Sequence, residues 1–160
     1  MTAPFPQPAL GRVTGITDPT LSFDGGRQTS EPDRTYNCVG WAFGRNDRWW
    51  WPDFDTWPIA LSGRGYMLDE FLHLFKTWGW AECTSASHET GIQKIALFVK
   101  ADGEPTHLAR MVLDDTYGDS TAGLWTSKLE RDIDVLHELN ALEGPALYGQ
   151  IHAIYSKPVD

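Results

Sequence analysis

The spacing of hydrophobic positions predicts one clear helix and a β-hairpin in the middle of the chain. Over residues 65–80, apolar side chains recur at helical spacing, and Gly79 supplies a stop signal. Segments 94–99 and 107–113 are apolar runs of strand length, joined by a polar turn that contains Gly and Pro. We therefore expect a helix followed by two antiparallel strands.

The rest of the pattern completes an α+β domain. A short helix is expected to begin near Cys38, and a second one is expected near 132–142, where apolar positions share one side. Strands are expected at 124–126 and 147–156. The predicted fold class is α+β, with an antiparallel sheet packed against the Cys38-bearing N-terminal helix.

The N-terminal part differs in composition from the rest. Residues 1–35 are rich in Pro, Gly, Thr and Asp, and repeated prolines interrupt any helix, so this part is interpreted as an extended arm. A length of 160 residues corresponds to about one domain of the usual size. Residues 36–160 are therefore predicted to form a single α+β domain.

The charge and the hydropathy of the chain argue against nucleic acids and membranes as partners. With 13 Lys and Arg against 22 Asp and Glu, the net charge is -9, which disfavours binding to nucleic acid. There is no apolar run of membrane-spanning length, and the first 15 residues lack the features of a secretory signal. We expect no membrane partner and a cytoplasmic location, with leaderless export left open.

Metal and cofactor signatures are not found in the sequence. There is no C-x-x-C, H-E-x-x-H, EF-hand or P-loop spacing, so no metal and no cofactor are expected. The two cysteines, Cys38 and Cys83, are too few for a disulfide framework, although one bridge between them stays open.

Cys38 and His107 are the candidate reactive groups. A nucleophilic cysteine reacts as a thiolate, which a helix N-terminus and a nearby imidazole both favour. Cys38 is expected at a helix start, and His107 begins a strand directly after a turn. The alternative is that Cys38 is a small buried apolar residue, which is the usual role of an isolated cysteine.

The tryptophan-rich segment 49–57 also has two interpretations. Aromatic faces near a cleft hold sugar rings or an extended peptide, whereas the same side chains also serve as packing over the first helix. Three consecutive tryptophans, Trp49 to Trp51, cannot all point inward from one extended segment. At least one of them is expected near the surface.

Two resemblances add to these observations. The helix-leading Cys in NCVGWA, followed by the strand-leading His in THLARMV, resembles papain-like cysteine hydrolases of the NlpC-type and CHAP branches. The chain more closely resembles a bacterial domain family of unknown function, over about residues 36–150. The pattern of that family includes NC-x-x-WA, WWWP, KIAL, H-x-AR, W-x-SKLG and a final YG, and Glu130 stands where its glycine is expected. The matching positions are Asn37, Cys38, Trp41, Ala42, Trp49 to Pro52, Lys94 to Leu97, His107, Ala109, Arg110, Trp125, Ser127, Lys128, Leu129, Tyr148 and Gly149.

The papain-like resemblance implies a set of catalytic roles. Cys38 would be the nucleophile and His107 the general base, later the general acid. The orienting residue would come from Thr126, Ser127 or Lys128, of which Ser127 is favoured. The backbone N–H of Cys38 and the Asn37 side chain would stabilise the oxyanion. The candidate substrate-binding residues are Trp41, Trp50, Trp51, Trp125 and Lys128.

Two functions follow from these expectations. The first is a cysteine hydrolase or acyltransferase that attacks an amide bond of a peptide or peptidoglycan-like substrate through a Cys38 thioester. The second is a non-catalytic binding or immunity-type module with a protein partner, in which Cys38 and His107 are structural. The acidic, aromatic-rich composition suits a basic or carbohydrate partner of such a module.

Overall fold

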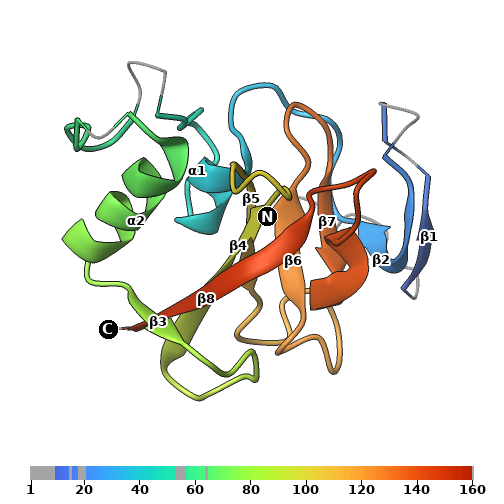
Figure 1. Cartoon of the computed structure of the whole chain (residues 1–160). Helices are drawn as coiled ribbons and strands as arrows, with labels where there is room; N and C mark the ends of the chain where they lie inside the picture. The colour runs from blue at the N-terminus through green and yellow to red at the C-terminus, as the bar shows by residue number, and fades with distance from the viewer. Residues whose placement is uncertain (1–9, 15, 18–20, 53–56, 64, 160) are drawn as a thin grey trace.

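An eight-stranded antiparallel sheet forms most of the molecule, in the order β1-β2-β7-β6-β5-β4-β8-β3 (Figure 1). The computed structural model describes residues 10–14, 16–17, 21–52, 57–63 and 65–159. The elements are β1 (Gly11–Val13), β2 (Phe23–Gln28), α1 (Cys38–Ala42), α2 (Met67–Thr77), β3 (Ala81–Cys83), β4 (Ile92–Val99), β5 (Pro105–Met111), β6 (Trp125–Lys128), β7 (Asp134–His137), the 3-10 helix η1 (Leu139–Leu142) and β8 (Gln150–Pro158).

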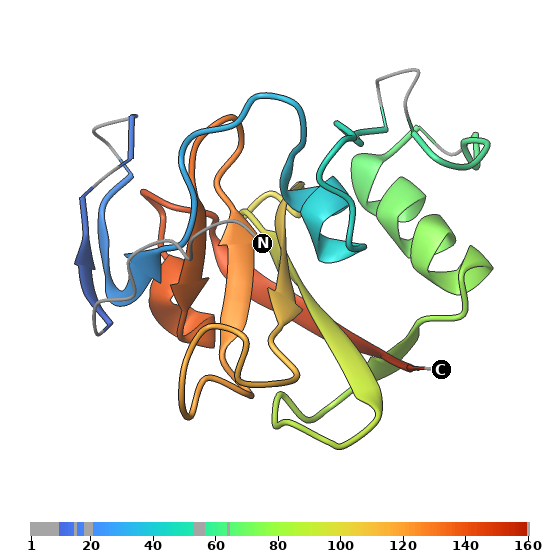
Figure 2. The same cartoon turned by 180° about the vertical axis from the view of Figure 1, so that it is seen from behind.

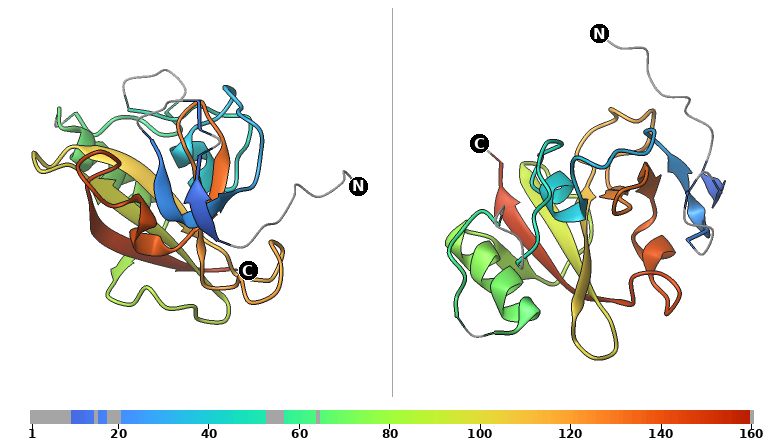
Figure 3. Two further views of the ribbon diagram at one scale, coloured as in Figure 1. Left: turned by 90° about the vertical axis from the view of Figure 1, so that its right-hand side faces the viewer. Right: turned by 90° about the horizontal axis from the view of Figure 1, so that it is seen from above.

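The two faces of the central strands support separate hydrophobic clusters. Side chains alternate along a strand, so Leu97 and Leu108 face one way while Phe98 and Ala109 face the other. The first face, which we call the helix face, packs against α1 and α2. The second face, which we call the strand face, packs against residues of β6, β7 and the N-terminal strands. The sheet is twisted, and β1 and β2 lie at the end of the molecule opposite α2 (Figures 2 and 3).

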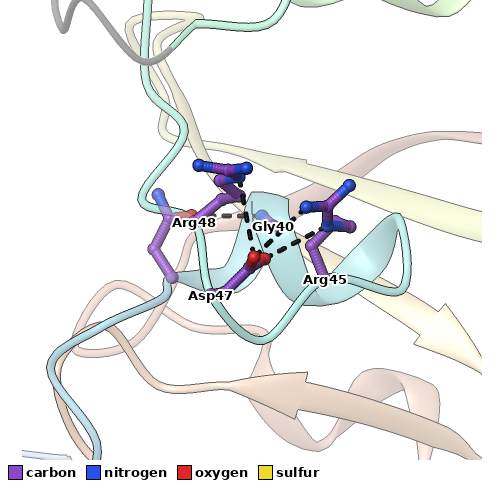
Figure 4. A network of polar contacts seen from close by, with 5 residues as sticks. Gly40, Arg45, Asp47 and Arg48 are labelled. Carbon is purple, nitrogen blue, oxygen red and sulfur yellow. Dashed lines mark hydrogen bonds and ion pairs between the residues drawn. The ribbon is translucent and has the colours of Figure 1, made fainter.

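The short helix α1 is fixed by its cap and by one close approach. The Asn37 side chain accepts a hydrogen bond from the Gly40 N–H, the usual arrangement of an N-cap. A Cβ atom on Gly40 would lie 2.5 Å from the carbonyl oxygen of Arg48, so only glycine fits here. The exposed Asp47 carboxylate pairs with Arg45 and Arg48 in the loop that follows, where the Arg45 N–H also bonds to the Gly40 carbonyl (Figure 4).

The four strands expected from the sequence are present and pair as neighbours, in the order β6-β5-β4-β8. The papain-like α+β arrangement, however, is wrong. The sheet has eight strands instead of four, and Cys38 begins a helix of only five residues. The main helical layer is α2, whose apolar face meets the sheet through Phe71, Leu74 and Phe75.

The helix expected near 132–142 is also wrong. This segment forms strand β7 and then the 3-10 helix η1. All four residues of β7 are buried, because β7 lies between β2 and β6 and is covered on both faces. A strand buried on both faces has no alternation of apolar and polar positions, so its pattern is easily mistaken for that of a helix.

The predicted arm of residues 1–35 lies partly outside the described residues. In the described part, β1 and β2 pair with each other, and β2 also pairs with β7 inside the main sheet. Cys38 and Cys83 are both free thiols. None of the helices in the described ranges is long and apolar enough to cross a membrane.

Candidate functional site

A cleft of about 420 Å³ lies beside the start of α1, with the Cys38 residue in its wall. Aromatic residues Trp49, Trp51 and Tyr148 line it together with other apolar side chains, and the exposed Lys100 and Glu130 add one charge of each sign. Its other lining residues are Leu21, Asn37, Pro105, Thr106 and Leu147. The cleft therefore brings together the tryptophan loop, the β4–β5 turn and the segment that precedes β8.

Cys38 carries a buried thiol whose pKa is raised. The residue is 4% exposed, and burial raises the pKa of its thiol from 9.0 to about 11. The nearby Glu130 carboxylate raises this pKa further, while a hydrogen bond with the Leu108 backbone acts in the opposite direction. Loss of hydration outweighs the stabilising hydrogen bond, so the thiolate is a minor species at neutral pH.

His107 is buried on β5, where it is 1% exposed. Its ring stacks on Tyr148 at a centroid distance of 4.2 Å and meets the edge of Phe98 at 5.4 Å. Burial lowers the pKa of His107 well below 6.5, and the neighbouring His137 lowers it further. The Nε2 atom of His107 is a buried nitrogen without a hydrogen-bond partner in the part of the chain that the structure describes.

The Cys38 thiol of α1 and the His107 imidazole of β5 face different hydrophobic clusters. The Cys38 thiol hydrogen bonds with the backbone of Leu108 and packs in the helix-face cluster. The His107 side chain is opposite Phe98 in the register and shares the strand face with it. No hydrogen bond joins the two side chains in the described structure, and the structure therefore does not assemble them as a hydrogen-bonded pair.

Proton transfer within this pair would be costly. Burial raises the pKa of the Cys38 thiol to about 11 and lowers the pKa of the His107 imidazole well below 6.5, so both shifts oppose transfer of the proton from sulfur to nitrogen. Both groups are consequently neutral at rest. The arrangement differs from an activated cysteine, whose thiolate is stabilised by neighbouring positive charge.

The other residues implied by the papain-like resemblance are engaged elsewhere. The Ser127 hydroxyl lies 2.7 Å from Nε2 of His137, on the strand face. The Asn37 side chain caps α1, and it also bonds with both the N–H and the carbonyl of Trp50. Neither side chain is directed to the Cys38 sulfur by a hydrogen bond, so the proposed orienting and oxyanion roles stay predictions.

The candidate substrate-binding tryptophans lie in different environments. Trp51 lines the cleft and packs edge-on against Phe71 of α2. Trp50 and Trp125 are buried in the helix-face and strand-face clusters, respectively. Trp41 is half-buried and does not line the cleft, and its indole N–H donates to Thr126. Of the four tryptophans, the structure places only Trp51 in the cleft.

Lys128 belongs to a buried polar cluster that attaches segment 30–36 to the sheet. Its ammonium group donates to the backbone carbonyls of Asp33, Tyr36 and Glu130, and it lies 4.6 Å from the centre of the Tyr36 ring. The Tyr36 hydroxyl donates to the Asp134 carboxylate at 2.8 Å. Lys128 is fully buried in this role and does not line the cleft.

Several cleft residues were given no role by the sequence. Tyr148 and Thr106 reach the cleft because the segment before β8 packs beside the start of β5, where the Thr106 hydroxyl donates to the Tyr148 carbonyl at 2.5 Å. Glu130 has a left-handed backbone with a φ of 57°, which favours glycine. The glycine of the W-x-SKLG pattern was therefore a signal for this backbone, and here a carboxylate occupies that position beside the cleft.

Together, these features define the molecule as an antiparallel-sheet domain with an aromatic cleft and a buried thiol in the cleft wall. A family model described as a domain of unknown function (DUF7689) matches residues 27–156, and the chain belongs to that family. The match supports the expected membership of a family of unknown function, but it confirms neither the individual motifs nor the papain-like resemblance. No curated protein and no solved structure matches the chain.

Proposed function

We propose that the protein is a non-catalytic binding module and that the cleft beside Cys38 is its ligand site. The observation that carries this proposal is the state of Cys38, which is buried and has a thiol pKa of about 11. A protonated thiol beside a neutral, buried imidazole serves as an apolar wall better than as a nucleophile. Cys38 and His107 then have structural roles.

The chemistry of the cleft indicates the kind of ligand. Trp49, Trp51 and Tyr148 offer aromatic surfaces for an apolar or aromatic group. Lys100 and Glu130 supply opposite charges that suit the polar groups of a peptide better than a strongly charged polymer. A protein partner that inserts an aromatic side chain and its flanking amides is therefore the proposed ligand.

A cysteine hydrolase or acyltransferase is the second candidate function. Two observations favour it: the Cys38 residue is part of the cleft wall, and the buried Nε2 of His107 has no partner among the described residues. Buried polar atoms are usually paired, so an orphaned nitrogen in a ring that stacks on Tyr148 of the cleft calls for a functional explanation. In this alternative, ligand binding would have to turn His107 towards the sulfur before any thioester forms.

Alkylation of Cys38 by iodoacetamide is expected to be slow and to accelerate about tenfold per pH unit from pH 6 to 9. A thiol with a pKa of about 11 has roughly 100-fold less thiolate at neutral pH than one with a pKa of 9.0. The rate at Cys38 is measured by mass spectrometry of the Cys83→Ser variant, with Cys38→Ala as the blank. A rate that levels off below pH 8 would instead support the activated cysteine of a hydrolase.

Replacing Trp51 with alanine is expected to weaken binding of N-acetylphenylalanine amide at least about tenfold, because an aromatic wall of the cleft is lost. The indole N–H signals in ¹⁵N NMR spectra report the titration. Cys38→Ala should leave the affinity within a few fold of the wild type, and Tyr66→Ala, at an exposed aromatic residue outside the cleft, is the matched control. Equal affinity of Trp51→Ala and wild type would place the ligand elsewhere.

A further inference from the structure

A second pocket, of about 300 Å³, is lined by residues of α1, β5 and β6 and shares no lining residue with the cleft. Trp41 of α1 forms one wall, and Arg110 and Thr126 contribute from β5 and β6. Tyr117 and Asp114 line it from the loop between these strands. The volume is at the lower end of the range for small-molecule sites.

The polar groups of this pocket are held in place by the sheet. Arg110 and Thr126 are directly opposite each other in the β5–β6 register, so their side chains point from the same face. The Trp41 indole N–H donates to the Thr126 hydroxyl at 3.3 Å, and the Tyr117 hydroxyl also hydrogen bonds with Thr126. Thr126 thus joins Trp41 and Tyr117 around the Arg110 position.

Arg110 is the unexplained group of the pocket. Its side chain is half-buried, yet its guanidinium makes no hydrogen bond or ion pair with any residue in the described ranges. The backbone after α1 passes close by, since a Cβ on Gly44 would lie 3.5 Å from Nη1 of Arg110. A chain with 22 acidic residues has many carboxylates to offer, but none is paired with this arginine in that part of the chain.

We propose that the Arg110 pocket binds a small monocarboxylate with a flat apolar body. The guanidinium matches a carboxylate through two parallel hydrogen bonds, and the half-buried Trp41 offers a surface for the apolar part. This site and its ligand are independent of the function proposed for the cleft.

Asp114 explains why a carboxylate is preferred to a phosphate. Its carboxylate accepts hydrogen bonds from the backbone N–H and the hydroxyl of Thr116, which lower its pKa below 3.8 and keep it ionised. A fixed negative charge in the same pocket penalises a ligand with a second negative charge more than a ligand with one.

Titration with sodium benzoate, followed by the Trp41 indole N–H signal in ¹⁵N NMR spectra, tests the proposal. The signal is assigned by its loss in Trp41→Phe. The wild type should show a saturable shift, and Arg110→Gln should weaken the affinity at least about tenfold, because the charged hydrogen bonds are lost. Arg34→Gln, at an exposed arginine outside the pocket, should bind as the wild type does.

Asp114→Asn keeps the test decisive even where Arg110→Gln does not fold. It should bind benzoate at least about twofold more tightly at low salt and gain affinity for inorganic phosphate, because the repulsive charge is gone. No saturable shift in the wild type would overturn the proposal, as would equal weakening by Arg34→Gln or unchanged affinities in Asp114→Asn. Tighter binding of phosphate than of benzoate by the wild type would overturn the assignment of a monocarboxylate.

Discussion

Replacing Gly149 with alanine is expected to lower the free energy of unfolding by about 2–5 kcal/mol. Gly149 has a left-handed backbone with a φ of 84°, and an added Cβ would lie 2.1 Å from the carbonyl oxygen of Val99. That contact is with backbone at the end of β4, which cannot move aside as a flexible side chain would. The variant therefore combines a strained conformation with a clash, and urea unfolding measures the loss.

Gly103→Ala is the matched control for this prediction. Gly103 has nearly the same φ, 86°, but a Cβ there would meet nothing within 4 Å. Gly103→Ala should lower the free energy of unfolding by about 1 kcal/mol, which is the cost of the left-handed backbone alone. Equal losses in the two variants would show that the approach to Val99 is not what requires glycine at 149.

Asp134→Asn is expected to stabilise the protein at pH 7 by up to about 3 kcal/mol. Burial raises the pKa of Asp134 from 3.8 to about 6, against the hydrogen bond from Tyr36 and the charge of Lys128. The folded state thus holds this proton more tightly than the unfolded chain does. The resulting stabilisation is fully present below about pH 4 and is lost as the pH rises through about 6. An asparagine side chain stays neutral at pH 7 and therefore avoids the cost of burying a charge. It also lacks the attraction between the carboxylate and Lys128, which offsets part of the gain.

Urea unfolding at pH 4 and pH 7 measures this effect. The wild type should lose more stability over this interval than Asp134→Asn does, and Asp119→Asn, at an exposed carboxylate, should follow the wild type. A pH dependence in Asp134→Asn as steep as that of the wild type would mean that other groups cause it.

Local signals in the sequence were sufficient for the middle of the fold. The β4–β5 hairpin follows from two apolar runs around a turn, and the helix expected over 65–80 is confirmed as α2. Both elements depend on contacts between residues that are near in the chain. The local pattern of β7 resembles that of a helix, because the strand is buried on both faces and one of its neighbours is β2, whose residues lie more than 100 positions away.

In the candidate site, too, residue types can be read from the sequence, whereas the contacts between distant segments cannot. Cys38, Trp49 and Trp51 were noticed because of their residue types, but the cleft that they share depends on Tyr148 packing beside Thr106. Whether a cysteine is activated depends on burial and on the orientation of a distant imidazole, and neither is encoded in the local pattern. The pairing of Ser127 with His137 likewise results from the alignment of β6 with β7.

The position of β2 in the sheet bears on how the chain reaches its native state. Gly26 of β2 is aligned with His137 of β7, so a strand near the start of the chain pairs with one that follows more than 100 residues later. β4 similarly pairs with β8, across more than 50 residues. Closing such long loops before any contact repays their entropy slows folding, which places a sheet of this kind in the millisecond-to-second range. On the ribosome, β2 would emerge early and remain without its β7 partner until residues 134–137 had been synthesised.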